Sequence, residues 1–591
     1  MRERLSYELD QAQITVLDTG GQYCHLIARR VRELGVYADV HPSETPIGEL
    51  PGRRGLIISG GPSSVYEPGS PTVERSTLEA GVPVLGICYG QQLMAHQLGG
   101  HVHKGEKGEY GLAHLEIVKA NPLFEGVAGR QQVWMSHRDK VDGLPAGFEL
   151  IGATETCPVG AIADAGRKLY GVQFHPEVVQ TLAGQRMLEN FVFGICGAVK
   201  DWEPTHQIPV VEEQIRQIAN GRSVFFFASG GVDSTVAYTL CLQALGAERV
   251  HATYVDTGLM REGETEFVRG VFESLAKGSF EVHDAKREFL GQLAGVREPE
   301  QKRKLIGEEF VAVQQRVLES GHYFDGDWIL GQGTIYPDTI ESGGTKKADL
   351  IKTHHNRVDG IQKLIAENRL VEPLREFYKD EVRQLGRAMG LPDELLDRHP
   401  FPGPGLAIRC LCHEGEAALE RLDEGWLVPV HSVGVQGDSR SYRPVLAIEG
   451  ADHGKATELI NRLTQVNRVM ARLGGGGELG AMRVFDSTIT EERLERLRRA
   501  DAIVRRLSVE SGFENRIWQF PVVLIPCGED KAKPDSVVLR PIESVDGMTA
   551  TAVPIPAELA ARMSAEILMV PGIAAVFLDL THKPPATIEW E

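Results

Sequence analysis

The centre of the chain carries a strand that enters a helix through a glycine-rich turn, and this feature constrains the fold most. The apolar run at 224–228 predicts a buried strand of a parallel sheet. Apolar residues at helical spacing predict a helix over 232–245. Backbone N–H groups and the positive end of the helix dipole converge at the turn between them, Ser229-Gly230-Gly231, so this turn suits a phosphate or a pyrophosphate.

The turn matches neither of two common phosphate-binding motifs. It lacks the lysine that follows the second glycine of a Walker A motif and the third glycine of the dinucleotide-binding G-x-G-x-x-G motif. Asp233 is informative, because a carboxylate beside a polyphosphate is repelled unless a cation lies between them. We therefore expect Mg²⁺ nearby, with Asp233 as a ligand. A turn whose aspartate serves only the helix dipole is the structural alternative.

The segment at 229–234 resembles the pyrophosphate loop of the N-type ATP pyrophosphatases. This resemblance implies an enzyme that splits ATP between its α and β phosphates and adenylates a carbonyl oxygen. The next predicted strand, 250–255, ends at Asp256, which should border the nucleotide because ligands of open α/β sheets bind beyond the carboxyl ends of strands. A structural Asx-turn is the alternative for Asp256. The residues expected to bind ATP are Ser229, Gly230, Gly231, Val232, Asp233, Ser234, Thr235 and Asp256.

Composition narrows the class of protein. The 591 residues are 42% hydrophobic and 25% charged, which is ordinary for a globular chain of three or four domains. The eight cysteines have no framework spacing, so we expect reduced thiols and a cytoplasmic protein. The charged N-terminus predicts no signal peptide, and the sequence has no run of about 20 apolar residues to span a membrane. The net charge of -19 argues against unspecific nucleic-acid binding, so the expected partners are small molecules.

A second strand, turn and helix lie near the amino terminus and carry a cysteine. Short apolar strands at 14–18, 56–58 and 84–87, with helical segments between them, predict an open α/β domain. The Gly-x-Cys88-x-Gly unit that follows has the form of a nucleophile elbow, in which glycines permit a strained turn. The N-terminus of the following helix shifts a thiol toward thiolate.

A thiolate nucleophile needs a base with an orienting partner. Residues i and i+2 of an extended segment point the same way, so His175 and Glu177 can lie side by side. We expect Cys88 to attack an amide carbonyl, His175 to pass the proton to the leaving ammonia and Glu177 to hold the imidazole tautomer. The backbone N–H groups of Gly60 and Tyr89 should meet the oxyanion. Taken alone, Cys88 is more often a buried small hydrophobe, and His175 a hydrogen-bonded structural histidine.

The elbow and the later phrase at 174–177 closely resemble the class I glutamine amidotransferase domain, in the same order. That resemblance implies hydrolysis of glutamine to glutamate and NH₃. The segment at 136–139 resembles the glutamine-site loop of the same family.

Further phrases resemble the family of glutamine-hydrolysing GMP synthases, and they lie at 254–258, 301–304, 330–334, 372–375, 380–383, 401–409 and 583–591. This resemblance implies XMP as the acceptor nucleotide. The XMP-binding residues that it implies are Arg303, Asp438, Gln519, Lys583 and Glu589. Among them, Arg303 or Lys583 suits the 5′-phosphate. The other three suit ribose hydroxyls or the base edge.

Three other patterns are weaker. A glycine- and lysine-rich stretch at 343–347 suits a lid over the phosphates, with a solvated surface loop as an equal alternative. His354 and His355 lack further ligands at metal-site spacing, so we expect no metal there. The segment at 410–413 resembles only half of a zinc site, so we expect its cysteines to pack in the core.

The expected fold class is α/β. Two open parallel-sheet α/β domains, at 11–203 and 206–400, precede an α+β C-terminal domain at 401–591 with two amphipathic helices. Extra length near 449–528 resembles the longer, eukaryote-like members of the family and puts the family's C-terminal dimer in doubt. The expected assembly is therefore a monomer or a homodimer.

The expected activity is that of a carbon–nitrogen ligase with glutamine as nitrogen donor. ATP would adenylate the C2 oxygen of XMP with Mg²⁺ as cofactor, and NH₃ from glutamine would displace AMP to give GMP. Another glutamine-fed adenylating ligase, which makes NAD or modifies tRNA, is the alternative among enzymes. A catalytically retired nucleotide-binding or scaffold protein is the alternative of another class. The acidic balance weighs against tRNA, the tail at 583–591 against NAD synthesis, and the presence of Cys88, His175 and Glu177 against a retired protein.

Overall fold

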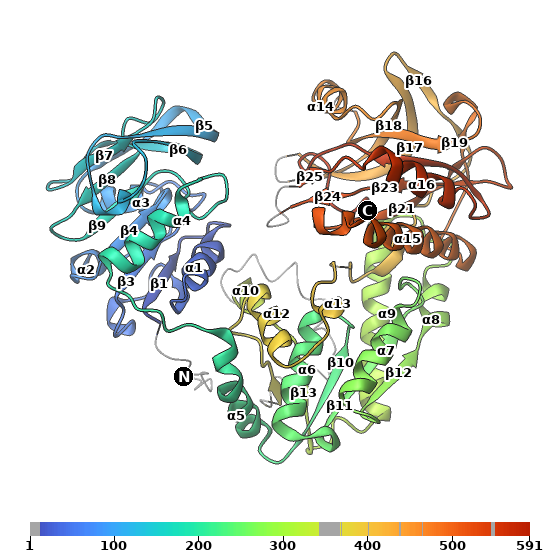
Figure 1. Cartoon of the computed structure of the whole chain (residues 1–591), viewed down its shortest axis with the longest axis horizontal. Helices are drawn as coiled ribbons and strands as arrows, with labels where there is room; N and C mark the ends of the chain where they lie inside the picture. Colours follow the sequence, from blue (N-terminus) through green and yellow to red (C-terminus); the bar gives the residue numbers. More distant parts are fainter. Residues whose placement is uncertain are drawn as a thin grey trace. The chain divides into compact units, whose positions relative to one another are not determined.

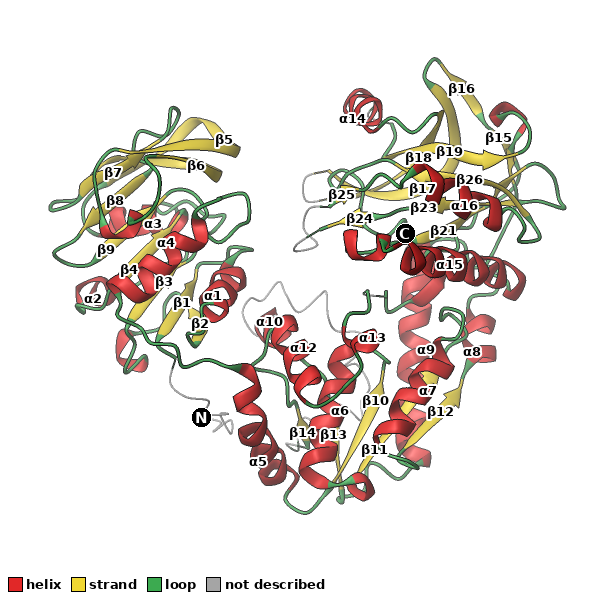
Figure 2. Ribbon diagram, in the orientation of Figure 1, coloured by secondary structure: helices red, strands yellow, loops and turns green. Residues whose placement is uncertain are grey.

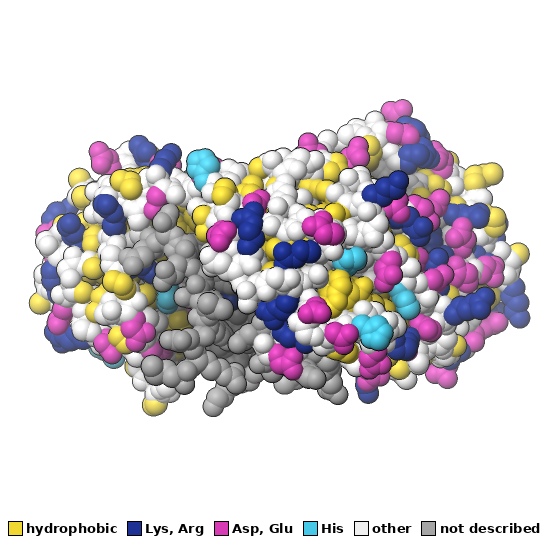
Figure 3. All heavy atoms as spheres, turned by 90° about the horizontal axis from the view of Figure 1, so that it is seen from below, with side chains coloured by type: hydrophobic (Ala, Val, Ile, Leu, Met, Phe, Trp, Pro, Cys, Tyr) yellow, Lys and Arg dark blue, Asp and Glu magenta, His cyan; other side chains and the backbone are white. Residues whose placement is uncertain are grey.

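The structure is a computed structural model that describes residues 12–341, 364, 367, 369–399, 401–436, 439–463, 465–544 and 550–591. The chain forms two compact units, Met1–Val210 and Val211–Glu591 (Figures 1 and 2). On the face drawn in Figure 3, Lys and Arg side chains lie among Asp and Glu side chains. Across the described ranges, every helix is too short or too polar to cross a bilayer.

A nine-stranded sheet organises the first unit. Its parallel half has the order β2-β1-β3-β4-β9, and an antiparallel half continues through β8, β7, β5 and β6. The sequence predicts only the parallel half, because buried parallel strands are continuous apolar runs, whereas β6 alternates buried and exposed residues. The strands are β1 (Ile14–Asp18), β2 (Ala38–Pro42), β3 (Gly55–Ile58), β4 (Val84–Ile87), β5 (His101–Ile117), β6 (Arg130–Gly143), β7 (Glu149–Ala153), β8 (Ala161–Asp164) and β9 (Leu169–Val172).

Helices accompany the parallel half of this sheet. The longest is α1, and α3 follows β4 directly and packs against β3, β4 and β9. Leu93 and Met94 of α3 join Leu17 and Ile58 of the strands in one buried cluster, which fixes the start of α3 on the sheet. The helices are α1 (Cys24–Glu33), α2 (Arg75–Glu79), α3 (Tyr89–Gln97) and α4 (Gly184–Glu189).

A five-stranded parallel sheet begins the second unit, with the order β12-β11-β10-β13-β14. The central strand β10 (Ser223–Ala228) and the helix α6 (Val232–Leu245) occupy the segments that the sequence predicts. The remaining strands are β11 (Val250–Asp256), β12 (Phe280–Asp284), β13 (Trp328–Gly331) and β14 (Leu370–Val371). The other long helices of this part are α5 (Ile208–Ala219), α7 (Glu264–Leu275), α9 (Pro299–Ser320) and α12 (Lys379–Ala388).

A seven-stranded mixed sheet completes the second unit, with the order β16-β17-β18-β19-β26-β23-β21. Three helices accompany it rather than the two expected: α14 (His453–Arg462), α15 (Glu491–Ser511) and α16 (Ala557–Ile567). The helix α15 packs against α16 and β21, so the segment near 449–528 is part of this layer. The strands are β16 (Glu420–Leu422), β17 (Gly425–Gln436), β18 (Ser439–Glu449), β19 (Arg468–Gly475), β21 (Val522–Ile525), β23 (Asp535–Leu539) and β26 (Ile573–Asp579).

The two sheets of the second unit share one hydrophobic core. Phe225 of β10 and Leu330 of β13 belong to the same buried cluster as Leu446 of β18 and Leu497 of α15. The connecting segment passes very close to the parallel sheet at Gly405, whose φ is 65°. A Cβ there would lie 2.3 Å from the carbonyl oxygen of Leu259, so the approach requires glycine.

Buried charges lie at the end of β26. Asp579 Oδ2 is 2.8 Å from Arg468 Nη1 and 2.8 Å from Arg540 Nη1, and all three side chains are 0% exposed. The indole N–H of Trp590 donates to the same oxygen at 3.0 Å. Burial raises the pKa of Asp579, but the two guanidinium groups outweigh it and hold the pKa below its usual range. The carboxylate thus neutralises two cations inside the mixed sheet.

Replacing Asp579 with alanine should destabilise the second unit by about 3–5 kcal/mol, because two buried guanidinium groups lose their counter-charge. Urea unfolding followed by far-ultraviolet circular dichroism measures this change. Glu510→Ala is the matched control, since Glu510 pairs with Arg506 at the surface, and its unfolding midpoint should stay that of the unmodified protein. Equal unfolding midpoints for Asp579→Ala and Glu510→Ala would show that Asp579 does not stabilise the sheet.

Candidate active sites

Cys88 lies at the turn between β4 and α3 in a strained backbone conformation. Its φ is 52° and its ψ is -105°, a combination that residues other than glycine rarely adopt. A Cβ at Gly90 would lie 2.3 Å from the carbonyl oxygen of Ile58, and a Cβ at Gly86 would lie 2.5 Å from the carbonyl of Gly90. Both glycines are therefore required for a turn that holds the thiol at the N-terminus of α3, where the helix dipole favours an anion.

His175 and Glu177 lie beside this thiol. His175 Nδ1 is 2.7 Å from Glu177 Oε1, and both side chains are buried. Burial lowers the pKa of His175, but the charge of Glu177 and hydrogen bonds with Cys88 and Glu177 outweigh it and raise the pKa to about 10. The imidazole therefore carries a proton at neutral pH, which it can give to a leaving group.

The thiol and the imidazole border a cavity of about 580 Å³. Gly60 forms part of the wall, and a Cβ there would come within 3.0 Å of His175 Cε1 and 3.5 Å of Cys88 Cβ. Tyr89, the second expected oxyanion residue, is the first residue of α3. The segment at 136–139 lies in strand β6 rather than in a loop, and it lines the same cavity. Its Ser136 carbonyl oxygen accepts a hydrogen bond from Cys88 Sγ at 3.6 Å.

Gln173 is a residue of this site that the sequence did not single out. Its Nε2 donates to Cys88 Sγ at 3.6 Å, and its Oε1 accepts from Gln92 Nε2 at 3.1 Å. Gln173 stands two residues before His175, just after β9 ends at Val172, and both side chains reach Cys88. That spacing is the signal by which it could have been found.

The segment at 229–235, expected to bind phosphate, consists of the turn at 229–231 that connects β10 to α6 and of the first turn of α6. Gly230 has a φ of 71°, and a Cβ there would lie 2.4 Å from Val268 Cγ2, so the position requires glycine. The hydroxyls of Ser229 and Ser234 are 3.0 Å apart. Because α6 begins at Val232, the backbone N–H groups of the loop lie at the positive end of a 14-residue helix. The loop can therefore hold an anion.

Asp233 in this loop pairs with a lysine. Lys379 Nζ, at the start of α12, lies 2.6 Å from each carboxylate oxygen of Asp233. No pattern in the sequence indicates this partner, which is 146 residues away along the chain. The Asp233 side chain is 29% exposed and offers the hard oxygen ligands that Mg²⁺ takes. Asp233 therefore suits a metal ion that also binds phosphate. Such an ion would replace Lys379 Nζ at the Asp233 carboxylate.

Asp256 ends β11, the strand beside β10. Its Oδ1 accepts from the Gly258 N–H at 3.0 Å, which is the Asx-turn that the sequence offered as the alternative. Its Oδ2 accepts from the Thr265 hydroxyl at 2.8 Å and is 3.2 Å from Lys286 Nζ. The carboxyl end of the parallel sheet therefore carries Lys286, the first residue of α8 (Lys286–Gln292), beside the buried Asp256 carboxylate.

The carboxyl-terminal tail is buried against α9. Lys302 Nζ is 2.6 Å from Glu591 Oε2, and Arg303 Nη2 donates to the Glu591 carbonyl oxygen. Glu589 accepts hydrogen bonds from Arg409 Nε at 2.9 Å and Nη2 at 2.7 Å. Two predicted XMP residues, Arg303 and Glu589, thus lie at the same tail. Arg409, which the sequence did not suggest, holds the carboxylate of the second.

Backbone pairing relates the other two described candidates. Gln519 bridges Ile542 in β24 (Ile542–Glu543), β24 pairs with β25 (Thr551–Ala552), and Ala550 bridges Lys583. Asp438 lies outside the described residues, as do the stretch at 343–347 and His354 and His355. Cys410 is a buried free thiol, and Cys412 is a partly buried one.

Known proteins that resemble this chain define its class. Residues 15–195 match the family model of class-I glutamine amidotransferases, and residues 507–590 match that of the GMP synthase C-terminal domain. The cavity with Cys88 and His175 therefore lies in a class I glutamine amidotransferase fold.

Curated relatives match along the whole chain. A probable GMP synthase (glutamine-hydrolyzing) of Leptospira interrogans is 42% identical over 98% of this chain and 99% of its own length. The GMP synthase (glutamine-hydrolyzing) of Aquifex aeolicus is 40% identical over 99% of this chain and 100% of its own, and that of Streptomyces coelicolor is 41% identical over 98% of each. The chain belongs to the family of glutamine-hydrolysing GMP synthases.

Replacing Glu177 with glutamine should move the alkaline limb of glutamine hydrolysis to lower pH. The Glu177 charge raises the pKa of His175, so without it the imidazole loses its proton at lower pH. We expect the rate above neutral pH to fall about 10²-fold, because the general acid for ammonia is lost. Glutamate release measured against pH tests this, with the exposed Glu79→Gln as control. If the alkaline limb of the pH profile does not move in Glu177→Gln, His175 is not the acid that protonates the leaving ammonia.

Proposed function

We propose that this chain makes GMP from XMP, ATP and glutamine, with AMP, pyrophosphate and glutamate as the other products. The observation that carries this proposal is the buried His175–Glu177 pair, 2.7 Å apart, beside a thiol on a strained turn. The same chain has a Ser-Gly-Gly phosphate loop at a helix N-terminus. A protein that only binds a nucleotide needs no such thiol, so the pair favours an enzyme over a retired binding protein.

The first reaction releases ammonia from glutamine. Cys88 Sγ attacks the side-chain amide carbon as a thiolate paired with protonated His175, and His175 gives its proton to the nitrogen as NH₃ leaves. Water then attacks the thioester, the neutral His175 takes a proton from it, and glutamate leaves with the thiolate and the protonated imidazole restored. The backbone N–H groups of Gly60 and Tyr89 stabilise the oxyanion in both steps. Glu177 keeps the imidazole oriented and stabilises its protonated form.

The second reaction consumes ATP. The C2 oxygen of XMP attacks the α-phosphorus, and pyrophosphate leaves toward the backbone N–H groups and hydroxyls of the loop at 229–235. NH₃ then attacks C2, and AMP leaves with the former C2 oxygen. Bound Mg²⁺, with Asp233 as its protein ligand, would supply positive charge to the phosphates. Asp256 borders the same nucleotide at the end of β11.

The acceptor site is proposed to consist of Arg303, Asp438, Gln519, Lys583 and Glu589. A cation at Arg303 or Lys583 suits the 5′-phosphate of XMP, and the carboxylates and the amide suit ribose hydroxyls and the base edge. The support for this assignment is the position of Arg303 and Glu589 at one tail, which buried charge pairs hold in place.

The proposed division of labour follows three segments. Residues 11–203 would release ammonia, residues 206–400 would bind ATP and adenylate, and residues 401–591, with an extended insertion near 449–528, would contribute the XMP site. The proposed partners are the small molecules glutamine, ATP and XMP, and neither nucleic acid nor a membrane. The proposed location is the cytoplasm, and the proposed assembly is a monomer or a homodimer.

Replacing Cys88 with alanine should abolish glutamine-dependent GMP formation, by about 10⁴-fold or more, because no other group can form the thioester. GMP formation from added ammonia should continue at the rate of the unmodified protein. Nucleotide products separated by chromatography measure both activities. Cys196→Ala, in the same unit, is the control and should retain both. Loss of the ammonia-dependent activity in Cys88→Ala would contradict the division between two sites.

Replacing Asp233 with asparagine should weaken the ammonia-dependent reaction and leave glutamine hydrolysis intact. An amide is a poorer ligand for Mg²⁺ than a carboxylate, so we expect half-saturation with Mg²⁺ to rise about tenfold or more. Asp284→Asn is the control, because Asp284 ends β12, the edge strand of the same parallel sheet, and is exposed. An unchanged Mg²⁺ dependence in Asp233→Asn would exclude Asp233 as the ligand.

A further inference from the structure

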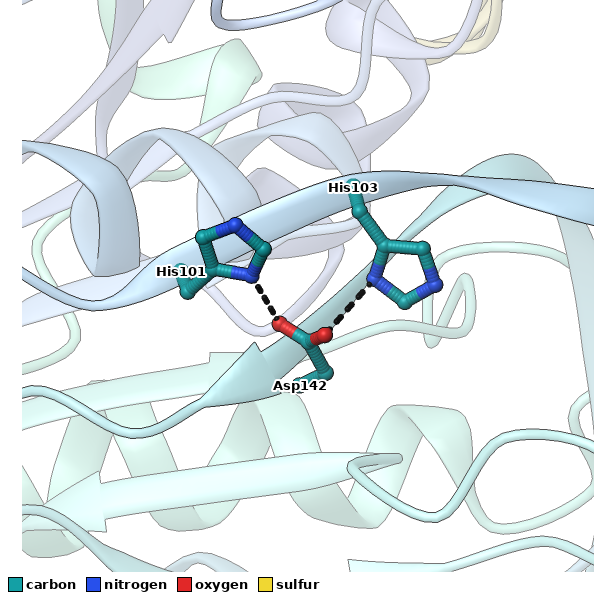
Figure 4. Close-up of side chains that lie close together, drawn as sticks. All are labelled: His101, His103 and Asp142. Carbon is teal, nitrogen blue, oxygen red and sulfur yellow. Dashed lines mark hydrogen bonds and ion pairs between the residues drawn. The ribbon is translucent and has the colours of Figure 1, made fainter.

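Two histidines and an aspartate converge on the surface of the first unit. His101 and His103 belong to β5, and Asp142 belongs to the neighbouring strand β6. His101 Nδ1 is 2.5 Å from Asp142 Oδ1, and His103 Nδ1 is 3.1 Å from Asp142 Oδ2. Figure 4 shows both imidazole rings directed at the one carboxylate.

The strand geometry explains why these side chains meet. His101 and His103 stand two residues apart on one strand, so they share a face, while Val102 between them is buried. His101 pairs with Gly143 and Val102 pairs with Val141, which leaves Asp142 as the extra residue of a β-bulge. A bulge re-aims a side chain and occurs often beside functional sites.

Glycine makes room for the first histidine. A Cβ at Gly143 would lie 2.9 Å from His101 Cβ, closer than such atoms come. The bulge and the glycine together place a carboxylate in front of two imidazoles. Parallel ring planes, with an interplanar angle of 14° and centroids 6.3 Å apart, keep both rings beside it.

We propose that His101, His103 and Asp142 bind one divalent transition-metal ion of the zinc type. Two imidazole nitrogens and one carboxylate oxygen form a mixed donor set that suits zinc and its neighbours rather than Mg²⁺ or Ca²⁺. One donor atom from each residue lies within 4.8 Å of the others. Tetrahedral zinc needs donors about 3.3 Å apart, so small ring rotations suffice.

The surface position leaves the fourth coordination position to water. The side chains of His101, Asp142 and His103 are 71%, 47% and 45% exposed, so they can adjust without disturbing the core. The ion would join β5 to β6 at one end of their ladder. Farther along this ladder, Lys104 pairs with Asp139, and both line the cavity of Cys88.

A second group of donors must be kept apart from this one. Glu109, His137 and Cys157 also lie within 4.8 Å of one another, but His137 lines the cavity of Cys88 and the group belongs to that site. Any zinc bound there is common to the unmodified protein and to variants at His101 and His103. The difference between them therefore reports on the surface site alone.

Titration of the full chain with ZnCl₂ in a calorimeter tests the proposal. We expect the double variant His101→Ala/His103→Ala to lose one equivalent of bound zinc. Asp142→Asn should weaken the same equivalent about tenfold or more, since even the loss of an outer-shell partner typically costs about 10–100-fold in metal affinity. His114→Ala, an exposed histidine of the same strand, is the matched control and should bind as the unmodified protein does.

Three results would overturn the proposal. The first is equal zinc stoichiometry and affinity in the unmodified protein and in the double variant. The second is equal loss of binding in the His114→Ala control, which would mean that any surface histidine contributes. The third is absence of zinc binding by the unmodified protein. Circular dichroism of each variant separates loss of ligands from loss of fold.

Discussion

Charge pairs buried at the carboxyl terminus hold the second unit together. Lys302 on α9 meets Glu591 at 2.6 Å, Arg409 meets Glu589 with two hydrogen bonds, and Trp590 between them donates to Asp579. Burial lowers the pKa of Lys302, but the Glu591 charge outweighs it and raises the pKa, so the lysine stays charged. A helix of the parallel-sheet part and the end of β26, an interior strand of the mixed sheet, are thereby bound to one short peptide.

This arrangement has a cost that argues for a functional reason. Removing ions from water is expensive, and well-packed apolar residues often stabilise a core equally well. Three consecutive tail residues with polar contacts of this kind are therefore poorly explained by stability alone. In the proposed function, the tail carries part of the acceptor site and must keep one conformation, which these pairs would hold.

The two candidate active sites share one local structure, and the proposed chemistry differs between them. In each, a buried parallel strand enters a helix through a turn that requires glycine, as at Gly90 beside Cys88 and at Gly230. The helix N-terminus then favours negative charge, and in the proposed function it faces the Cys88 sulfur in one unit and the phosphates of ATP in the other. The difference lies in the turn itself. Cys88 takes the strained φ of 52° so that its side chain projects, whereas Gly230 leaves only backbone at the surface of the loop.

Local patterns predicted most of what lies within a few residues along the chain. The helix at 232–245 and the elbow at Cys88 follow from periodicity and from glycine spacing. His175 and Glu177 lie side by side as expected, but a turn at 176–177 brings them together rather than the extended segment that the sequence suggests. The antiparallel half of the first sheet carries no such signal. Its strands alternate and are paired by long-range register rather than by an apolar run.

Partners from distant segments could not be predicted. Lys379 reaches Asp233 across 146 residues, and Arg409 reaches Glu589 across 180. Asp233 has a cationic partner, but that partner is Lys379, whereas the sequence suggests only a metal ion. Long-range pairs of this kind depend on the tertiary fold, which no spacing along the chain records.

The most direct test of adenylation at the C2 oxygen of XMP follows that oxygen atom into the products. XMP labelled with ¹⁸O at C2 is turned over with ATP, Mg²⁺ and glutamine, and phosphorus nuclear magnetic resonance reads the isotope shift of each product. Adenylation of the C2 oxygen predicts that the label appears in the phosphate of AMP, together with unlabelled pyrophosphate and GMP. Label in pyrophosphate or in water would contradict adenylation of the C2 oxygen. Formation of ADP and phosphate in place of AMP and pyrophosphate would contradict it as well.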